Sequence, residues 1–363
     1  MPISLGEFLS IGHSSADPND LDDDDETMPD SSSQTIKPPP PPLPHHSLIE
    51  STLELTALTD LGPTVFTNTR PLWRPPNARG IFGGAVIAQS LAAAIRTVPD
   101  NFAIHSMHCY FVLAGDWTIP VIYTVELVRD GRSFATRTVQ ARQKGRCIFT
   151  TTCSFQRPSE GKASLEAQEP LPPDLRKPDE CDDGEAIARK MVQQGRMTEE
   201  GFEQWKRTKE GDPFERRVLG IHNNNDTNPT TKRVRSWIRA KGTIGAPAGS
   251  APHFEALAYV SDSWFLGTIL RAHKTASVGM MVSLDHTIYF HAPFRADEWM
   301  FLESDTPWAG DQRGLVHQRI TDSKGRLLAT CFQEGLVRIK DVKGEDAVSS
   351  ETGANGNKKE SKL

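Results

Sequence analysis

The chain has 363 residues, which is long enough for two domains of ordinary size, each with its own core. It carries 41 Lys and Arg residues against 47 Asp and Glu, a formal net charge of −6, so its overall charge gives no reason to expect binding to nucleic acid or to an anionic membrane. No apolar run approaches the ~18 residues that a helix needs to cross a bilayer, and no membrane span is predicted.

The first segment, residues 1–46, has the composition of a disordered tail. An acidic run at 22–26 is followed by a Ser-rich patch and by five prolines at 38–42. Low hydrophobicity and like charges cannot offset the entropy lost on ordering such a segment. The proline tract is interpreted as a solvated spacer, with an SH3 or WW ligand as the alternative. Residues 341–363 are predicted to form a second disordered tail.

Residues 47–157 are predicted to be the first globular unit. Gly83 and Gly84 open an amphipathic helix that ends before Pro99. Four β-rich stretches follow, and the last two flank the turn 143–145 as a long hairpin. One helix followed by several antiparallel strands indicates an α+β fold. The predicted strands cover 106–112, 120–128, 133–142 and 146–155.

Residues 158–233 differ in composition from the flanking segments and are predicted to connect two units. Several prolines break the early part, a charged and helical piece runs over 184–209, and three asparagines at 223–225 indicate a loop. We expect peripheral helices here.

Residues 234–340 repeat the pattern of the first unit. A helix is predicted over 255–272, strands over 282–291 and 299–304, and a hairpin whose strands 314–321 and 326–339 flank the turn 322–325. The letters Lys-Gly-Arg at 144–146 recur at 324–326, and Tyr-Phe at 110–111 recurs at 289–290. A nearly constant offset across several elements indicates an internal duplication.

Three polar residues of the second unit are candidates for chemistry. Asp262 lies in the middle of the apolar segment 257–266, where a carboxylate must be paired or its pKa rises; a purely structural Asp satisfied by a neighbouring serine explains the pattern equally well. Ser283 interrupts a hydrophobic strand. Gln333 stands in the last hairpin strand, where the first repeat has Cys153. Together a carboxylate, a hydroxyl and an amide can hold and deprotonate one water molecule.

No metal site is predicted. The cysteines are odd in number and have no CxxC spacing, so they are interpreted as reduced, buried residues. The pairs His105/His108 and His286/His291 have odd spacings, which put their members on opposite faces of a strand. The cysteines are Cys109, Cys147, Cys153, Cys181 and Cys331.

Five segments, taken in order, resemble the type II acyl-CoA thioesterases, a family that includes bacterial thioesterase II and a peroxisomal long-chain enzyme. The resemblance implies a double hotdog, in which two tandem repeats each have a long helix wrapped by an antiparallel sheet. The repeats would be 47–157 and 234–340. The segments read GGAVIAQSLAAA (83–94), HSMHCYFVLAGD (105–116), RDGRSFATRTV (129–139), SLDHTIYFHAPF (283–294) and ATCFQEGLVR (329–338).

The resemblance also implies an activity and its residues. The family's Asp, its hydroxyl residue and its Gln fall on Asp262, Ser283 and Gln333, which would activate water to hydrolyse medium- or long-chain fatty acyl-CoA. The products would be a free fatty acid and CoA. Gly83 and Gly84 are candidates for stabilising the oxyanion through backbone N–H groups at a helix start. The family implies no cofactor, acyl-CoA as substrate and a homo-oligomer.

The sequence closes on Ser361, Lys362 and Leu363, the tripeptide that the peroxisomal import receptor reads. We therefore expect the peroxisomal matrix as the location.

Two alternatives are weighed against hydrolysis. A hotdog enoyl-CoA hydratase usually pairs an Asp with a His in a segment rich in Asn and Pro, and no such block lies near either predicted long helix. A non-catalytic acyl-CoA-binding protein would bind acyl-CoA without releasing CoA. A thiol-trapping assay separates the three, because only hydrolysis frees the CoA thiol.

Overall fold

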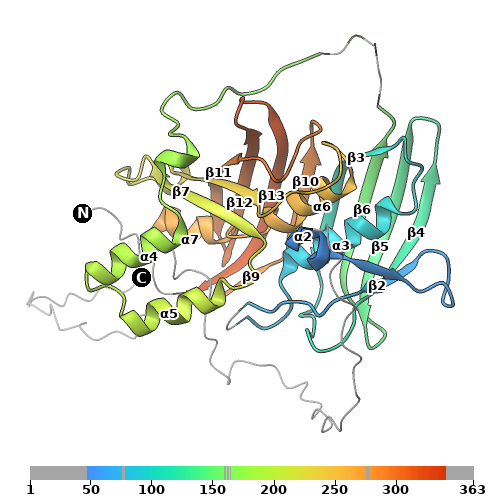
Figure 1. Cartoon of the computed structure of the whole chain (residues 1–363), viewed down its shortest axis with the longest axis horizontal. Coiled ribbons are helices and arrows are strands. Elements are labelled where there is room, and N and C mark those ends of the chain that lie inside the picture. Colours follow the sequence, from blue (N-terminus) through green and yellow to red (C-terminus); the bar gives the residue numbers. More distant parts are fainter. Residues whose placement is uncertain are drawn as a thin grey trace, which may run out of the picture.

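The computed structural model describes residues 47–75, 78–158, 161, 163, 165–274 and 278–340 (Figure 1). The two predicted tails lie outside these residues. No helix in the described ranges is long and apolar enough to cross a membrane. The helices are α2 (Leu48–Leu53), α3 (Gly83–Ile95), α4 (Gly184–Gln193), α5 (Glu199–Thr208), α6 (Ala251–Ser261) and α7 (Gly267–His273), with short 3-10 turns η1 (Pro178–Glu180) and η2 (Pro229–Thr231).

The strands form one antiparallel sheet in the order β1-β2-β4-β5-β6-β3-β10-β13-β12-β11-β8-β7, with β9 pairing β13 off this path. The second six strands repeat the first six in reverse, so equivalent strands lie at equal distances from the centre. The strands of the first half are β1 (Leu55–Ala57), β2 (Val65–Asn68), β3 (Ala103–Phe111), β4 (Ile122–Asp130), β5 (Phe134–Gln143) and β6 (Arg146–Gln156). The others are β7 (Phe214–His222), β8 (Arg233–Ala240), β9 (Val278–Ser283), β10 (Asp285–Phe290), β11 (Met300–Gly310), β12 (Arg313–Asp322) and β13 (Leu327–Ile339).

The two halves join where β3 pairs with β10. In this register His108 lies opposite Thr287, and the His108 Nδ1 is 3.2 Å from the Thr287 Oγ1. These two residues are 179 positions apart, which is the offset that relates Tyr110 to Tyr289 in the sequence. A residue therefore pairs with its own equivalent at this point, as expected if a pseudo-twofold axis relates the two halves.

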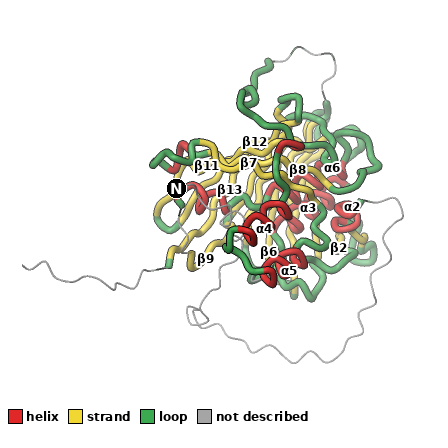
Figure 2. Tube along the Cα trace, turned by 60° about the vertical axis from the view of Figure 1, so that its left-hand side comes forward, coloured by secondary structure: helices red, strands yellow, loops and turns green. Residues whose placement is uncertain are grey.

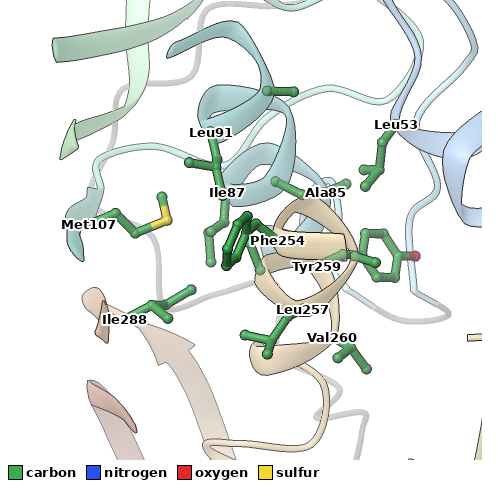
Figure 3. Packing of buried hydrophobic residues seen from close by; sticks show 14 of the residues in the cluster. Leu53, Ala85, Ile87, Leu91, Met107, Phe254, Leu257, Tyr259, Val260 and Ile288 are labelled. Atoms are coloured by element: carbon green, nitrogen blue, oxygen red, sulfur yellow. The ribbon is translucent and has the colours of Figure 1, made fainter. Parts of the chain in front are cut away.

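The helices α3 and α6 pack against each other, as Figure 3 shows, and α3 is also in contact with the strands of the first half. Every residue of α3 from Gly84 to Ala94 is buried, and so is most of α6. Ile87 and Phe254 from these helices belong to the same continuous core as Met107 of β3 and Ile288 of β10. The two halves thus share one core, as the double hotdog expectation requires.

The predicted helix 255–272 is wrong in one respect. It is two helices, because the chain leaves the helical conformation after Ser261 and α7 starts only at Gly267. Trp264 in this break has a left-handed backbone, with φ of 67°. Asp262 is consequently the C-cap of α6 and does not lie in the middle of a helix.

The predicted strand 282–291 is likewise interrupted, at Leu284. The range predicted as a connection contains α4 and α5, but it also supplies strand β7, which pairs with β8 at the edge of the sheet. Both α4 and α5 lie on the outside of the molecule, on the left in Figure 1 and towards the front in Figure 2.

Candidate active site

Asp262 occupies the gap between the two central helices. It caps the C-terminus of α6, and its carboxylate lies beside the first turn of α3, which belongs to the other half of the chain. The side chain keeps partial contact with solvent although α6 itself is buried. A partly exposed carboxylate in apolar surroundings can meet a water molecule and still have a perturbed proton affinity.

Gln333 of β13 links the other two predicted residues. Its side chain has 0% exposure, and its Nε2 donates to Asp262 Oδ1 at 2.7 Å and to Ser283 Oγ at 3.0 Å. A carboxylate accepts hydrogen bonds only, so the amide must present its nitrogen to Asp262. The three residues singled out from the sequence therefore lie in one hydrogen-bonded group.

A β-bulge brings Ser283 to this group. Ser283 ends β9 opposite Gly335, whereas Thr287 of β10 lies opposite Phe332, so one extra residue separates the two pairings. Leu284 N donates to Glu334 O at this step, and Asp285 Oδ1 accepts from Glu334 N at 2.7 Å. Such bulges re-aim side chains, and this one places Ser283 beside the amide of Gln333.

The glycines at the start of α3 allow the halves to approach. A Cβ on Gly84 would lie 2.2 Å from the carbonyl oxygen of Tyr259, and a Cβ on Gly83 would lie 2.8 Å from Asp262 Oδ2. The backbone N–H of Gly84 is close enough to the Asp262 carboxylate to lower its pKa. The oxyanion role expected for Gly83 and Gly84 stays a prediction.

Three causes set the pKa of Asp262. Burial raises it above the ordinary value for an aspartate, and the hydrogen bonds from Gln333 and from the Gly84 N–H lower it in part. Because burial is the largest cause, the pKa stays raised. The carboxylate is thus a better proton acceptor than an exposed aspartate.

One further polar contact behind the site was missed from the sequence. Ser261 Oγ lies 2.9 Å from His286 Nε2, and both side chains are buried. Burial lowers the pKa of His286 to about 3, so this imidazole is neutral. This hydrogen bond fixes the last turn of α6 next to Asp262. Spacing along the sequence does not show that this helix and strand meet, so the contact could not be predicted.

The remaining predictions concern cysteines, histidines and the C-terminus. All five cysteines are unpaired, as expected, and four are buried, whereas Cys147 is partly exposed. Within the described ranges, no three His, Cys, Asp or Glu side chains gather as a metal site. His105 and His291 lie near hydroxyl groups, those of Ser154 and Thr330. The tripeptide 361–363 lies outside the described residues.

Comparison with known proteins identifies the family. Models described as the acyl-CoA thioesterase N-terminal and C-terminal domains match residues 70–156 and 178–337. The chain is 39% identical over 273 residues to acyl-coenzyme A thioesterase 8 of Rattus norvegicus, covering 75% of this chain and 84% of that protein. It belongs to the type II acyl-CoA thioesterase family. Acyl-CoA thioesterase 2 of Haemophilus influenzae is 34% identical, covering 72% of this chain and 89% of that protein.

Solved structures agree with this assignment. The acyl-CoA thioesterase II TesB2 of Mycobacterium marinum has a TM-score of 0.62 and 29% identity, covering 81% of this chain and 99% of that one. A protein from Alicyclobacillus acidocaldarius described as having a hot dog fold has a TM-score of 0.59 at 16% identity. The double hotdog prediction is confirmed, and this thioesterase is a thioester hydrolase.

Proposed function

We propose that Asp262, Ser283 and Gln333 activate the water that hydrolyses a medium- or long-chain fatty acyl-CoA. The observation that carries the proposal is that Gln333 Nε2 lies within hydrogen-bond distance of both other side chains. Gln333 uses its two N–H bonds on these partners, which leaves a lone pair of the Asp262 carboxylate and the Ser283 hydroxyl hydrogen available to a water molecule.

The chemistry follows from this arrangement. Water donates one hydrogen to Asp262 and accepts a hydrogen bond from Ser283, so a lone pair is free to attack the thioester carbonyl. Asp262 takes the proton as the C–O bond forms, and the collapse of the tetrahedral intermediate breaks the C–S bond and releases CoA thiolate, which is then protonated. A thiolate is a tolerable leaving group, so no Ser–His pair is needed.

The oxyanion is assigned to the first turn of α3. Phe82 caps this helix without a side-chain hydrogen bond, so the N–H groups of the first turn and the positive end of the helix dipole face the site. With the Gly84 N–H on Asp262, we assign the oxyanion to the Gly83 N–H. Partly buried Phe82 and Phe111 would offer the acyl chain an apolar surface.

Asp262→Asn tests the proposal. The variant keeps the shape of the side chain but lacks the base. With palmitoyl-CoA we expect kcat to fall about a hundredfold or more, as measured by trapping the thiol of the released CoA. Asp311→Asn, on an exposed turn, is the control. Wild-type turnover in Asp262→Asn would remove the proposed base.

A rate profile over acyl-CoAs of increasing length tests the chain-length preference.

We also propose import into the peroxisomal matrix through Ser361, Lys362 and Leu363. A relative 29% identical to this chain is named peroxisomal acyl-coenzyme A thioester hydrolase 1 of Saccharomyces cerevisiae, which supports the proposal. An N-terminally tagged chain should enter peroxisomes, and deletion of Leu363 should leave it outside. Self-association into a homo-oligomer stays a prediction that sedimentation velocity tests.

A further inference from the structure

The two copies of the hairpin turn differ in charge. The β5–β6 turn contains Arg142, Lys144 and Arg146, and no acidic residue occurs between 140 and 148. In the β12–β13 turn the position of Arg142 is taken by Asp322, whose carboxylate accepts the backbone N–H of Lys324 and pairs with Arg326. The second copy therefore neutralises part of its charge within the turn itself, whereas the first copy has no carboxylate within the turn.

The two turns also differ in whether other residues pack against them. The β12–β13 turn is covered by the connection, because Gln168 Nε2 donates to Gly325 O at 2.6 Å and Leu171 lies 3.3 Å from the place of a Gly325 Cβ. Nothing lies within 4 Å of a Cβ built on Gly145, and Lys144 is exposed. Only the first turn is open to a ligand.

The open turn lies at the active-site end of the molecule. Strand β3 runs antiparallel to β6, so the end of β3 at Phe111 is beside the start of β6. Phe111 contacts Phe149 with ring centres 5.4 Å apart and would touch a Cβ on Gly83. Three antiparallel pairings separate β6 from β13, so the β12–β13 turn is at the opposite end, as Figure 1 shows.

Neighbouring loops extend the positive charge. Arg74 stacks 3.7 Å over the ring of Trp117, and Asp116 N donates to Gln143 Oε1 next to the turn. Residues 78–82 are joined to this group by the hydrogen bond from Ile81 N to Gly115 O, and Phe82 N donates to Trp73 O. Asp116 is the single acidic residue of the three segments 69–82, 112–121 and 140–148. Its carboxylate accepts two hydrogen bonds from Thr118, which lower its pKa most, and Lys144 lowers that pKa further.

Four exposed cations thus form a first-half basic surface: Arg74, Arg79, Lys144 and Arg146. None of them makes an ion pair within the described part of the chain. On a protein with a net charge of −6, such a surface is a local exception that attracts anions.

We propose that the first-half basic surface binds the 3′-phospho-ADP part of CoA. Arg146 is three residues from Phe149 along β6, or about 10 Å, a separation that the pantetheine arm bridges when the thioester lies at Asp262. The cations would contact the phosphates, and the Arg74–Trp117 stack would offer a flat face to the adenine. The inference rests on the proposed site only for the position of the thioester.

The double variant Lys144→Glu/Arg146→Glu tests this, with Lys324→Glu as the matched control in the other copy of the turn. For each protein, kcat/KM is measured with an acyl-CoA and with the acyl-pantetheine of the same chain, which lacks the phosphates. We expect the preference for acyl-CoA to fall about tenfold or more in the double variant. The control should keep the wild-type preference.

Calorimetric titration with adenosine 3′,5′-bisphosphate separates this inference from the catalytic proposal. Wild type and Lys324→Glu should bind it, with affinity that falls as salt is added, and the double variant should bind it about tenfold or more weakly. Equal binding by all three proteins would overturn the inference even if hydrolysis proceeds as proposed. Loss of binding in the double variant supports it even if Asp262 proves not to be the base.

Discussion

Asp262 lies where two helix ends with opposite partial charges meet. The C-terminus of α6 carries carbonyl groups that disfavour a carboxylate, and the N-terminus of α3 offers N–H groups that favour one. Burial is nevertheless the largest influence on its proton affinity. The residue therefore depends on groups contributed by both halves of the chain.

The raised pKa of Asp262 predicts the acid limb of the pH–rate profile. The proposed base works only when ionised, so kcat should fall as pH decreases through a pKa above that of an exposed aspartate. Gln333→Leu removes a hydrogen bond that favours the charged form, so the limb should move to higher pH. Stopped thiol-release assays from acid to neutral pH measure both profiles. An unshifted limb in Gln333→Leu would contradict this account.

The same pKa predicts a gain in stability for Asp262→Asn. A carboxyl group with a raised folded-state pKa binds more protons folded than unfolded, so stability falls as pH rises from the unfolded pKa through the folded one. At pH 7 we expect the variant to be more stable by on the order of 1 kcal/mol. The difference should vanish below the unfolded pKa. Denaturant melts at both pH values measure this, and a less stable variant at pH 7 would refute the sign.

At the scale of elements, the close approach of α3 and α6 depends on Gly84. Its Cβ would lie 2.2 Å from backbone, so Gly84→Ala must push the helices apart. We expect a loss of about 1–3 kcal/mol and a fall in kcat, since the first turn of α3 moves away from Asp262. Gly245→Ala is the control, because nothing lies within 4 Å of its Cβ. Thermal melts and kcat measurements on both variants test this prediction, which fails if Gly84→Ala is as stable and active as Gly245→Ala.

The elements that were predicted correctly are those with strong local patterns. The β5–β6 hairpin was placed because Lys144 and Gly145 form a turn between alternating strands, and both have positive φ in the structure. The break between α6 and α7 was missed because the apolar segment continues through it, and because the residue with the left-handed backbone is Trp264 and not a glycine. Strand β7 was missed because its charged letters, such as Arg216 and Arg217, mask the alternation.

The site was predictable in composition and not in geometry. Asp262, Ser283 and Gln333 stood out as polar residues in apolar segments, and the family resemblance selected them. The contribution of Gly84 from the other half follows from helix packing across the duplication. The bulge at Leu284 depends on register between three strands, which no local pattern encodes.

At the scale of the whole molecule, the halves are not independent domains. One sheet passes through both, and their helices share a core. Ile288→Ala removes a fully buried side chain at the β3–β10 joint and should cost about 2–5 kcal/mol. Because the core is shared, calorimetry should show one transition that moves to lower temperature. Two separate transitions, one of them unmoved, would show that each half melts alone.

The joint between β3 and β10 has a consequence for synthesis. A nascent first half leaves the ribosome with the edge of β3 bare, and the strand that covers it is encoded about half a chain later. An unpaired strand edge can pair with other chains, so the nascent protein is most prone to aggregation, and most in need of chaperones, until β10 has been synthesised. Under the proposed mechanism, catalysis can begin only after this interval, since Gln333 lies on β13, the last strand of the described residues.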